Sequence, residues 1–245
     1  MHILEMVVCS YIQEDKMIKD SIGNRMKENY ENAYRIKLTR RTPVILRLDG
    51  KAFHTLTRGC EKPFDNKLQT AMVRTGMFLM EEIQGAKCAY IQSDEISILL
   101  TDFDRLNTSA WFDNNLQKIV SISASFASVK FTEFYGKMGI FDSRAFNVPK
   151  EEVCNYFVWR QQDWFRNSLQ MLSQSHFSHK KLHGKNTPDM HEMLHEKGVN
   201  WAELEPRWKN GVFLSKEERA FTVFEDVVLT SDRSVVEKHL VPKEE

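Results

Sequence analysis

The pattern of apolar and polar positions predicts a core in which short strands alternate with helices. Four apolar runs rich in branched residues are typical of buried strands, at 44–48, 88–92, 96–100 and 145–148. Between them, apolar residues recur at helical spacing from Leu68 to Ile83 and again from about Asn114 to Phe134. The resulting order is βαββαβ, the order of a ferredoxin-like fold.

The last third of the chain has a different pattern. Residues 151–183 are expected to form one long helix or two broken ones, and 211–214 and 221–229 a short hairpin. We therefore predict an α+β fold, in which a ferredoxin-like βαββαβ core is followed by a mostly helical C-terminal region. The expected division is an N-terminal extension at 1–19, the core at 20–150 and the helical region with its hairpin at 151–245.

Composition narrows the class of protein. Of 245 residues, 42% are hydrophobic and 28% are charged, which is typical of a globular domain. No apolar run approaches the ~18 residues of a membrane helix, and the N-terminus lacks the basic leader and long apolar segment of a signal peptide. The scattered cysteines form no CxxC pair, so we expect reduced thiols and a cytoplasmic location. Basic and acidic residues number 34 each, which argues against non-specific polyanion binding but permits a local basic patch.

Two acidic turns lie at the ends of predicted strands. Asp49 ends the first strand, and Ser93-Asp94-Glu95 separates the second from the third. In a ferredoxin-like sheet the first and third strands lie side by side and antiparallel, so the end of one meets the start of the other. Ordinary strand-end turns are the alternative interpretation, but this topology brings Asp49 and Asp94 to one edge. Carboxylate oxygens there suit Mg²⁺, and two such ions would support phosphoryl or nucleotidyl transfer.

A second motif indicates different chemistry. His191, Glu192 and His195 match HExxH, in which two helical imidazoles bind zinc and the glutamate acts as general base of a peptidase. Trp201 occupies the third ligand position of the longer pattern, and an indole cannot bind zinc; Glu217 or Glu218 could supply that ligand instead. The simpler interpretation is a surface helix in a His-rich region, with a zinc metallopeptidase as an alternative.

Basic residues lie among aromatic ones in the C-terminal region, as in segments that bind a nucleic-acid backbone and stack bases. The candidate RNA contacts are Arg160, Arg166, Asn167, Lys180, Lys181 and Lys209. A solvated helix face is the alternative, and a solvated loop is the simpler interpretation of the cluster Lys37, Arg40 and Arg41 before the first strand. A non-catalytic RNA-binding ferredoxin-like module also stays open, although the third strand lacks the aromatic pair that such modules display.

The chain resembles the tRNA-His guanylyltransferase superfamily across roughly residues 20–215. The matching segments follow in the same order and spacing, and they read LRLDGKAFHTLT, KPFD, AYIQSDEISILL, FDSRAFNVP and WRQQDWFRNS. The resemblance implies a core similar to the palm of polymerases and nucleotidyl cyclases. It also implies nucleotide addition in the reverse, 3′-to-5′ direction.

The resemblance assigns roles to individual residues. It implies that Asp49, the Gly50 carbonyl and Asp94 hold two Mg²⁺ ions, and that Asp49 and Asp94 are catalytic with Glu95 beside them. The implied substrates are ATP and GTP or other nucleoside triphosphates. Successive main-chain amides would cradle the triphosphate, from Lys51, Ala52, Phe53 and His54. Further positions map onto nucleotide contacts of the family, namely Lys62, Asp65, Ser93 and Lys118.

The implied reaction comprises two nucleotidyl transfers. ATP first activates a 5′-monophosphorylated tRNA end by adenylylation, and the 3′-hydroxyl of an incoming nucleotide then displaces AMP. Members that add an untemplated guanosine to tRNA-His carry a His-Ile-Asn-Asn element, but here the stretch 165–168 reads Phe-Arg-Asn-Ser. The family's Lys-Asn-Glu element reads Met190-His191-Glu192. We therefore predict a bacterial-type relative that repairs 5′-truncated tRNA by template-directed addition, with untemplated addition to tRNA-His as the alternative. A homotetramer is implied by the resemblance alone.

Overall fold

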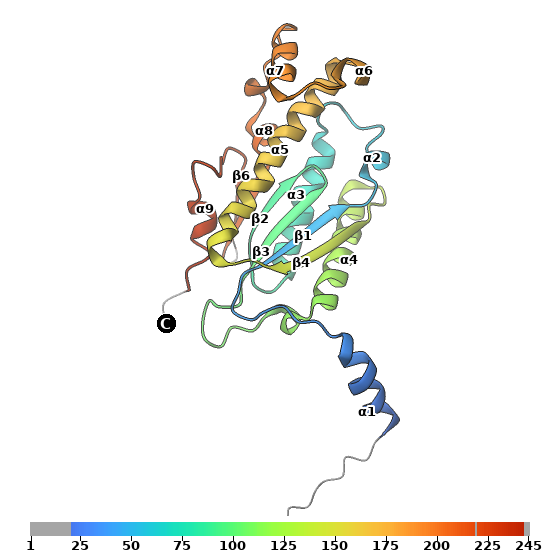
Figure 1. Ribbon diagram of the computed structural model, residues 1–245, viewed down its shortest axis with the longest axis vertical. Coiled ribbons are helices and arrows are strands. Elements are labelled where there is room, and N and C mark those ends of the chain that lie inside the picture. The colour runs from blue at the N-terminus through green and yellow to red at the C-terminus, as the bar shows by residue number, and fades with distance from the viewer. Residues whose placement is uncertain (1–20, 219, 243–245) are drawn as a thin grey trace, which may run out of the picture. The chain divides into compact units, whose positions relative to one another are not determined.

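The computed structural model describes residues 21–218 and 220–242 (Figure 1). Contacts divide the chain between Arg35 and Ile36 into two units. The first unit is helical where it is described: α1 (Ile22–Met26) continues as a π-helical turn at Lys27–Glu31 and a 3₁₀ turn at Asn32–Tyr34. The predicted N-terminal extension at 1–19 lies outside the described residues.

The second unit is built on a six-stranded antiparallel sheet in the order β4-β1-β3-β2-β5-β6. Its strands are β1 (Val44–Gly50), β2 (Ala86–Gln92), β3 (Glu95–Leu100), β4 (Phe141–Asn147), β5 (Val212–Glu217) and β6 (Ala220–Phe224). The inner order 4-1-3-2 is that of a ferredoxin-like βαββαβ unit. The predicted α+β fold is therefore confirmed.

The sheet extends across the predicted division at residue 150. The hairpin of β5 and β6 joins the sheet, because β5 pairs with β2 from Cys88↔Ser215 to Ile91↔Val212. The predicted core and the C-terminal region are thus parts of one compact unit. The fourth strand also begins earlier than predicted, at Phe141, because its outward positions alternate with inward ones and interrupt the apolar run.

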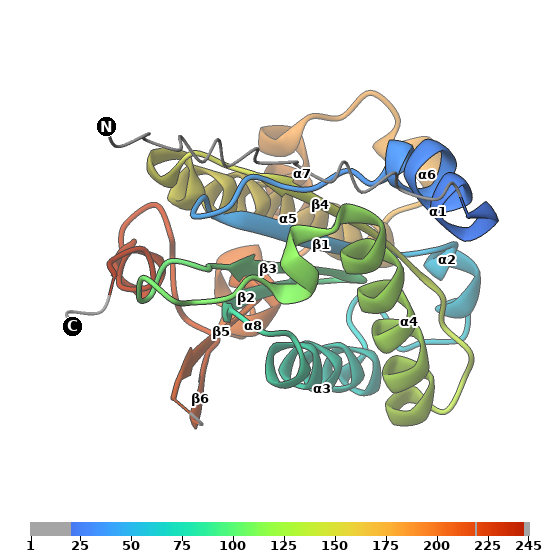
Figure 2. The same ribbon diagram turned by 90° about the horizontal axis from the view of Figure 1, so that it is seen from below.

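Helices cover both faces of the sheet (Figure 2). On one face lie α3 (Asn66–Glu82) and α4 (Leu116–Tyr135), whose buried residues share a core with Leu46 and Leu48 of β1. On the other face lies α5 (Val153–His176), whose Phe157 packs in a second core with Ile45. Burial on both faces explains why β3 is buried at every position and why the inner strands have continuous apolar runs.

Short helices complete the second unit. The α-helical ones are α2 (Phe53–Leu56), α6 (His179–Leu182), α7 (Thr187–His195), α8 (Pro206–Asn210) and α9 (Ser234–Glu237). Single 3₁₀ turns lie at Trp111–Asn114, Lys150–Glu152 and Trp201–Glu203. Where the chain is described, no helix is long and apolar enough to cross a membrane, and Cys60, Cys88 and Cys154 form no disulfide.

Candidate active site

The two acidic turns meet at one edge of the sheet. Asp49 lies opposite Glu95 in the antiparallel pairing of β1 with β3, and Asp94 lies in the turn between β2 and β3. The amide of Gly50 donates a hydrogen bond to the carbonyl of Asp94 at 3.0 Å, which joins the two turns through their backbones. We call this region, consisting of Asp49, Gly50 and Asp94, the acidic edge. Its formation confirms the convergence that the predicted topology required.

The electrostatics of the acidic edge favour a bound cation. Burial raises the pKa of the Asp94 carboxyl above its ordinary value, and the negative charges of Asp49 and Glu95 raise it further. A cation would offset this repulsion. Among the described residues no group of three or more His, Cys, Asp and Glu side chains could hold a metal by itself. The two carboxylates and the Gly50 carbonyl nevertheless fit Mg²⁺, which commonly completes its shell with water and substrate phosphates.

Glu95 differs from its neighbours because arginines neutralise it. Arg160 donates to its two carboxylate oxygens through Nε and Nη2, each at 2.7 Å, and Arg47 Nε lies 3.2 Å away. Ser97 Oγ donates to the same carboxylate at 3.2 Å. Glu95 is 6% exposed, so it positions the sheet edge and α5 rather than acting at the reacting atoms as the sequence indicated. Arg160 is 6% exposed and its guanidinium is bound to Glu95, but it also lines the pocket between the sheet edge and α5, so its role in RNA binding stays a prediction.

The turn after β1 contains the amides that were predicted to bind a triphosphate. Ala52 adopts the left-handed conformation, with φ 55°, and starts α2. The amides of Ala52, Phe53 and His54 lie where a helix offers N–H groups without intrahelical acceptors. The amide of Lys51, however, already donates to the carbonyl of Ile140 at 2.7 Å, so it is not available to a ligand.

A pocket of about 350 Å³ lies beside this turn. It is lined by Gly50, Ala52, Phe53, His54, Thr57, Leu68, Ser93 and Asp94. Gly50 must be glycine, because a Cβ there would lie 2.4 Å from Cδ2 of Phe53. The Phe53 ring packs in the core against Phe131, with ring centroids 5.0 Å apart, so Phe53 can offer a ligand only its backbone.

Of the remaining predicted nucleotide contacts, Ser93 lines this pocket and the other three do not. Asp65 caps α3, since its carboxylate accepts the amides of Leu68 at 2.8 Å and Glu61 at 3.0 Å. Lys62 is exposed in the preceding loop. Lys118 lies in the first turn of α4, which joins the segment before β1 through the bond from the Leu116 amide to Ile36. That is the opposite end of the strand, about 20 Å from Asp49, so Lys118 lies away from this pocket in the same chain, and the nucleotide contact predicted for it stays a prediction.

A second pocket, of about 410 Å³, lies between the acidic edge and α5. It includes Asp49 and Asp94, and α5 contributes Asp163, Asn167, Gln170 and Gln174. These four residues recur at helical spacing and form one polar stripe, which we call the α5 stripe. Of them, only Asn167 was predicted as a site residue. The spacing itself was the signal that could have found the others.

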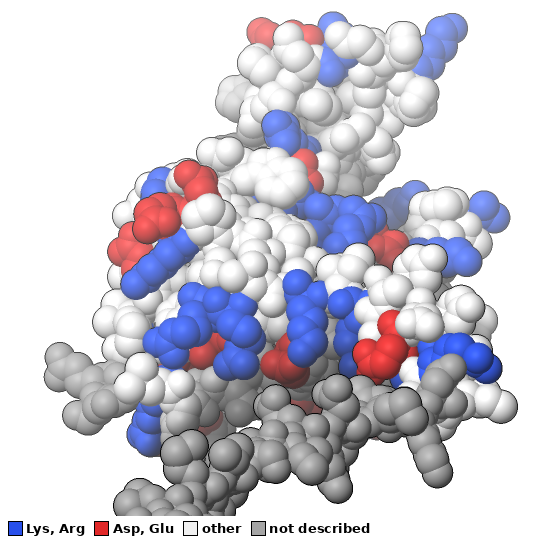
Figure 3. Space-filling view, turned by 60° about the horizontal axis from the view of Figure 1, so that its bottom comes forward, with Lys and Arg blue, Asp and Glu red and all other residues white. Residues whose placement is uncertain are grey.

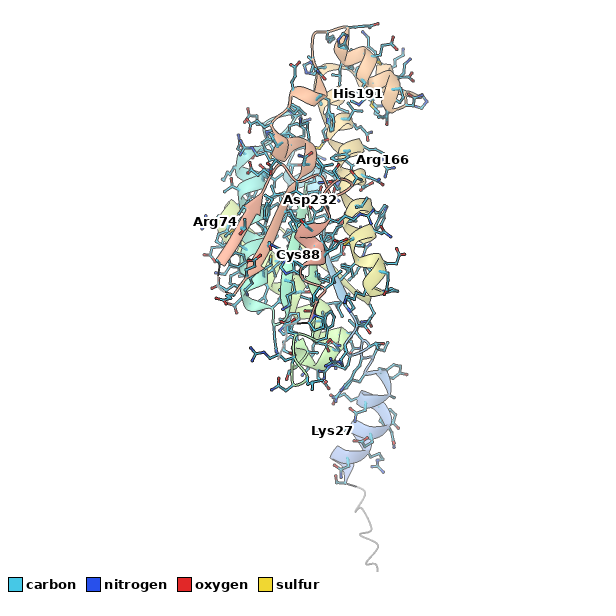
Figure 4. All side chains as sticks on the ribbon, turned by 90° about the vertical axis from the view of Figure 1, so that its left-hand side faces the viewer. Lys27, Arg74, Cys88, Arg166, His191 and Asp232 are labelled. Carbon is cyan, nitrogen blue, oxygen red and sulfur yellow. The ribbon has the colours of Figure 1, made fainter. Side chains whose placement is uncertain are left out.

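The other predicted RNA contacts lie outside this pocket. Arg166 points outward from α5 and forms an ion pair with Asp163 at 3.1 Å (Figure 4). Lys180 and Lys181 are exposed on α6. Lys209 donates to the carbonyl of Ala202 at 2.6 Å. Their role in RNA binding stays a prediction.

The HExxH motif does not form a zinc site. His191 and His195 are exposed on α7, and the ring of His191 packs edge-on against Trp201, with centroids 5.8 Å apart. Glu217 instead lies on β5 and pairs with Lys238. His191 lies far from the sheet interior marked by Cys88 (Figure 4). With Trp201 against His191 and Glu217 paired to Lys238, no third ligand joins the two histidines among the described residues.

Comparisons with known proteins agree with this geometry. The family model of tRNAHis guanylyltransferase matches residues 23–149. The tRNA(His) guanylyltransferase of Debaryomyces hansenii is 30% identical over 201 residues, covering 72% of this chain and 74% of that protein. A bacterial tRNA(His) guanylyltransferase (Thg1)-like protein solved in complex with ATP superposes with a TM-score of 0.86 at 50% identity, covering 90% of this chain and 99% of the other. A structure of such a protein in complex with GTP gives a TM-score of 0.81 at 46% identity, with the same coverage. Sequence, fold and acidic edge together establish that the chain belongs to the tRNAHis guanylyltransferase family of nucleotidyltransferases.

Proposed function

We propose that this protein is a template-directed 3′-to-5′ nucleotidyltransferase that restores missing nucleotides at the 5′ end of truncated tRNA. The observation that carries the proposal is the pair of pockets at the acidic edge. One pocket contains the first-turn amides of α2, the other contains the α5 stripe, and Ser93 and Asp94 line both. A nucleoside triphosphate on one side and an RNA 5′ end on the other would meet at Asp94.

The residues of the acidic edge would act mainly by position and charge. Asp49, the Gly50 carbonyl and Asp94 would hold two Mg²⁺ ions, which when bound lower the pKa of an attacking hydroxyl and neutralise charge on the leaving phosphate. The amides of Ala52, Phe53 and His54 would bind triphosphate oxygens. The hydrogen bond between Gly50 and Asp94 keeps the two carboxylate turns in register while substrates change.

The reaction would proceed in two balanced steps. An oxygen of the RNA 5′-phosphate attacks the α-phosphorus of ATP, and pyrophosphate leaves. The 3′-hydroxyl of the incoming nucleotide then attacks the RNA 5′-phosphorus, loses its proton, and releases AMP. A triphosphorylated RNA end would need only the second step. No protein nucleophile takes part in either step.

Repair is favoured over untemplated addition to tRNA-His by the environment of Phe165. This residue stands where the His-Ile-Asn-Asn element would place histidine, and its ring packs against Trp201 with centroids 6.0 Å apart. An apolar contact thus replaces an imidazole that could bind a substrate.

The proposal also includes GTP and other nucleotides as substrates, a homotetramer and a cytoplasmic location. Light scattering on the purified protein would test the tetramer.

The decisive experiment uses a tRNA that lacks its 5′-terminal nucleotide, with ATP, Mg²⁺ and each nucleoside triphosphate singly. We expect extension only by the nucleotide complementary to the opposing base, and a change of that base should change the nucleotide added. Asp49→Ala should abolish extension. Asp142→Ala is the matched control, because Asp142 is the exposed neighbour of Asp49 on β4 and lines neither pocket. Extension that ignored the opposing base, or survived Asp49→Ala, would refute the proposal.

A further inference from the structure

A strained turn lies at the end of the sheet opposite the acidic edge. Phe112, Asp113 and Asn114 have φ values of 49°, 51° and 58°, in the left-handed region that a bulky side chain such as Phe rarely adopts. Arg41, in the segment that leads into β1, has φ 58°. The two segments are adjacent, since the Leu38 amide donates to the Asn114 carbonyl at 2.9 Å. Strain of this kind is often retained where function requires a particular presentation of side chains.

Buried and exposed carboxylates hold these turns in place. Asp102, which is 5% exposed, accepts the Arg41 amide at 2.8 Å and Arg40 Nε at 2.6 Å. Asp113 pairs with Lys37 and lies 3.6 Å from Arg40. The Asp102 carboxylate therefore binds the backbone of Arg41 and leaves its guanidinium exposed.

The surface that results is basic and contains an exposed aromatic ring. We call it the basic turn surface, consisting of Lys37, Arg40, Arg41, Arg105, Phe112 and Lys118. The side chains of Arg41 and Arg105 are exposed and form no ion pair with any described residue. Phe112 is 39% exposed, and Lys118 Nζ lies 5.9 Å from its ring centroid. Figure 3 shows Lys and Arg side chains, with carboxylates between them, on the face that its rotation brings forward.

We propose that the basic turn surface binds the phosphate backbone of RNA, with Phe112 stacked on an unpaired base. This inference rests on the proposed function, since the RNA would be the one whose 5′ end lies at the acidic edge. The whole chain has a net charge of +0, so attraction of a polyanion must be local. The surface lies one strand length, about 20 Å, from Asp49. An RNA could therefore contact both ends of the sheet over several base pairs.

Basic side chains around an exposed ring are the usual means of binding a nucleic-acid strand without sequence preference. Two features distinguish this surface from a solvated loop. Among the described residues, Asp102 and Asp113 are the carboxylates that form ion pairs with these five cations, through Lys37 and Arg40, so positive charge remains in excess. The Phe112 ring is 39% exposed and packs against Trp111, with centroids 4.6 Å apart, on a backbone conformation that glycine would adopt with less strain.

The first test measures RNA affinity without nucleotides, so it does not depend on catalysis. The probe is the 5′-truncated tRNA with a fluorescent 3′ end, titrated with full-length protein at several salt concentrations. The variant Arg41→Ala/Arg105→Ala should bind about tenfold more weakly, and its slope of log K against log salt should be shallower by roughly 1.4–1.8. The matched control is Arg74→Ala/Lys130→Ala, which removes the same charge from α3 and α4 and should bind like the wild type.

The second test separates RNA binding from a purely structural role. Phe112→Gly relieves the left-handed strain but also removes the ring's contact with Trp111, so the melting temperature should change little while RNA affinity falls. A structural role predicts that the melting temperature falls together with RNA affinity. Wild-type affinity and salt slope in the arginine variant, or equal losses in its control, would overturn the proposed surface. Weaker RNA binding by that variant, with no nucleotide addition by the wild type, would support the surface and refute the proposed function.

Discussion

Removal of the Arg160 guanidinium is expected to destabilise the protein, because the buried carboxylate of Glu95 would no longer have enough positive charge beside it to balance its own. Both side chains are 7% exposed, and two hydrogen bonds of 2.7 Å join them. Breaking a buried ion pair from one side costs about 3–5 kcal/mol. Arg47 Nε remains 3.2 Å from Glu95 and retains part of the compensation. We therefore expect Arg160→Met to lower the free energy of unfolding by about 3 kcal/mol, at the low end of that range.

A double-mutant cycle measures this coupling. Arg160→Met, Glu95→Gln and the double variant would be unfolded in urea, with tryptophan fluorescence as the signal. The double variant should be more stable than the sum of the single losses predicts, by at least about 1.5 kcal/mol. Arg166→Met is the control, because Arg166 is exposed and its pair with Asp163 should contribute at most about 1 kcal/mol. Additive losses in the cycle, or equal losses for the two arginine variants, would refute the assignment of Glu95 as a positioning residue.

Three further outcomes follow from the site and the core. Burial lowers the pKa of His239 to about 4, so the unfolded chain binds more protons than the folded one below about pH 6.5. The free energy of unfolding should therefore fall by at most about 3 kcal/mol as the pH drops from 6.5 to 4. Urea unfolding across this range should show the loss in the wild type, and the His239→Gln variant should lack it. Gly50→Ala should cost about 1–3 kcal/mol, because the added Cβ meets the Phe53 ring, and an ATP titration should show weaker binding. The variant His191→Ala/His195→Ala should add nucleotides like the wild type. After chelation, Mg²⁺ rather than Zn²⁺ should restore nucleotide addition. Loss of nucleotide addition in the variant would support the zinc hypothesis.

The acidic edge could be predicted because it depends on strand order alone. Once the apolar runs indicated βαββαβ, the pairing of the first and third strands placed Asp49 opposite the Asp94 turn. That inference required only the position where the first strand ends and the position where the third strand begins. The observed register, Asp49↔Glu95, agrees with it.

The roles of individual side chains near the acidic edge could not be predicted in the same way. Glu95 and Arg160 are separated by 65 positions, and their pairing depends on how α5 packs across the sheet. A guanidinium next to tryptophan indicated RNA binding in the sequence, whereas in the structure it satisfies a buried carboxylate. Lys118 was assigned to the nucleotide by the resemblance, and the apolar pattern gave the extent of α4 but not which end of the sheet the helix begins at.

The pairing of β5 with β2 has a consequence for how the chain folds during synthesis. Until residues 212–217 have left the ribosome, β2 has an open edge in the middle of the future sheet. Glu95 likewise has no Arg160 to neutralise it until α5 has emerged. A nascent chain that ends near residue 150 is therefore expected to be aggregation-prone and to need chaperone protection. The carboxylates of the acidic edge are made early, but the charge balance of Glu95 beside them is completed only by the last third of the chain.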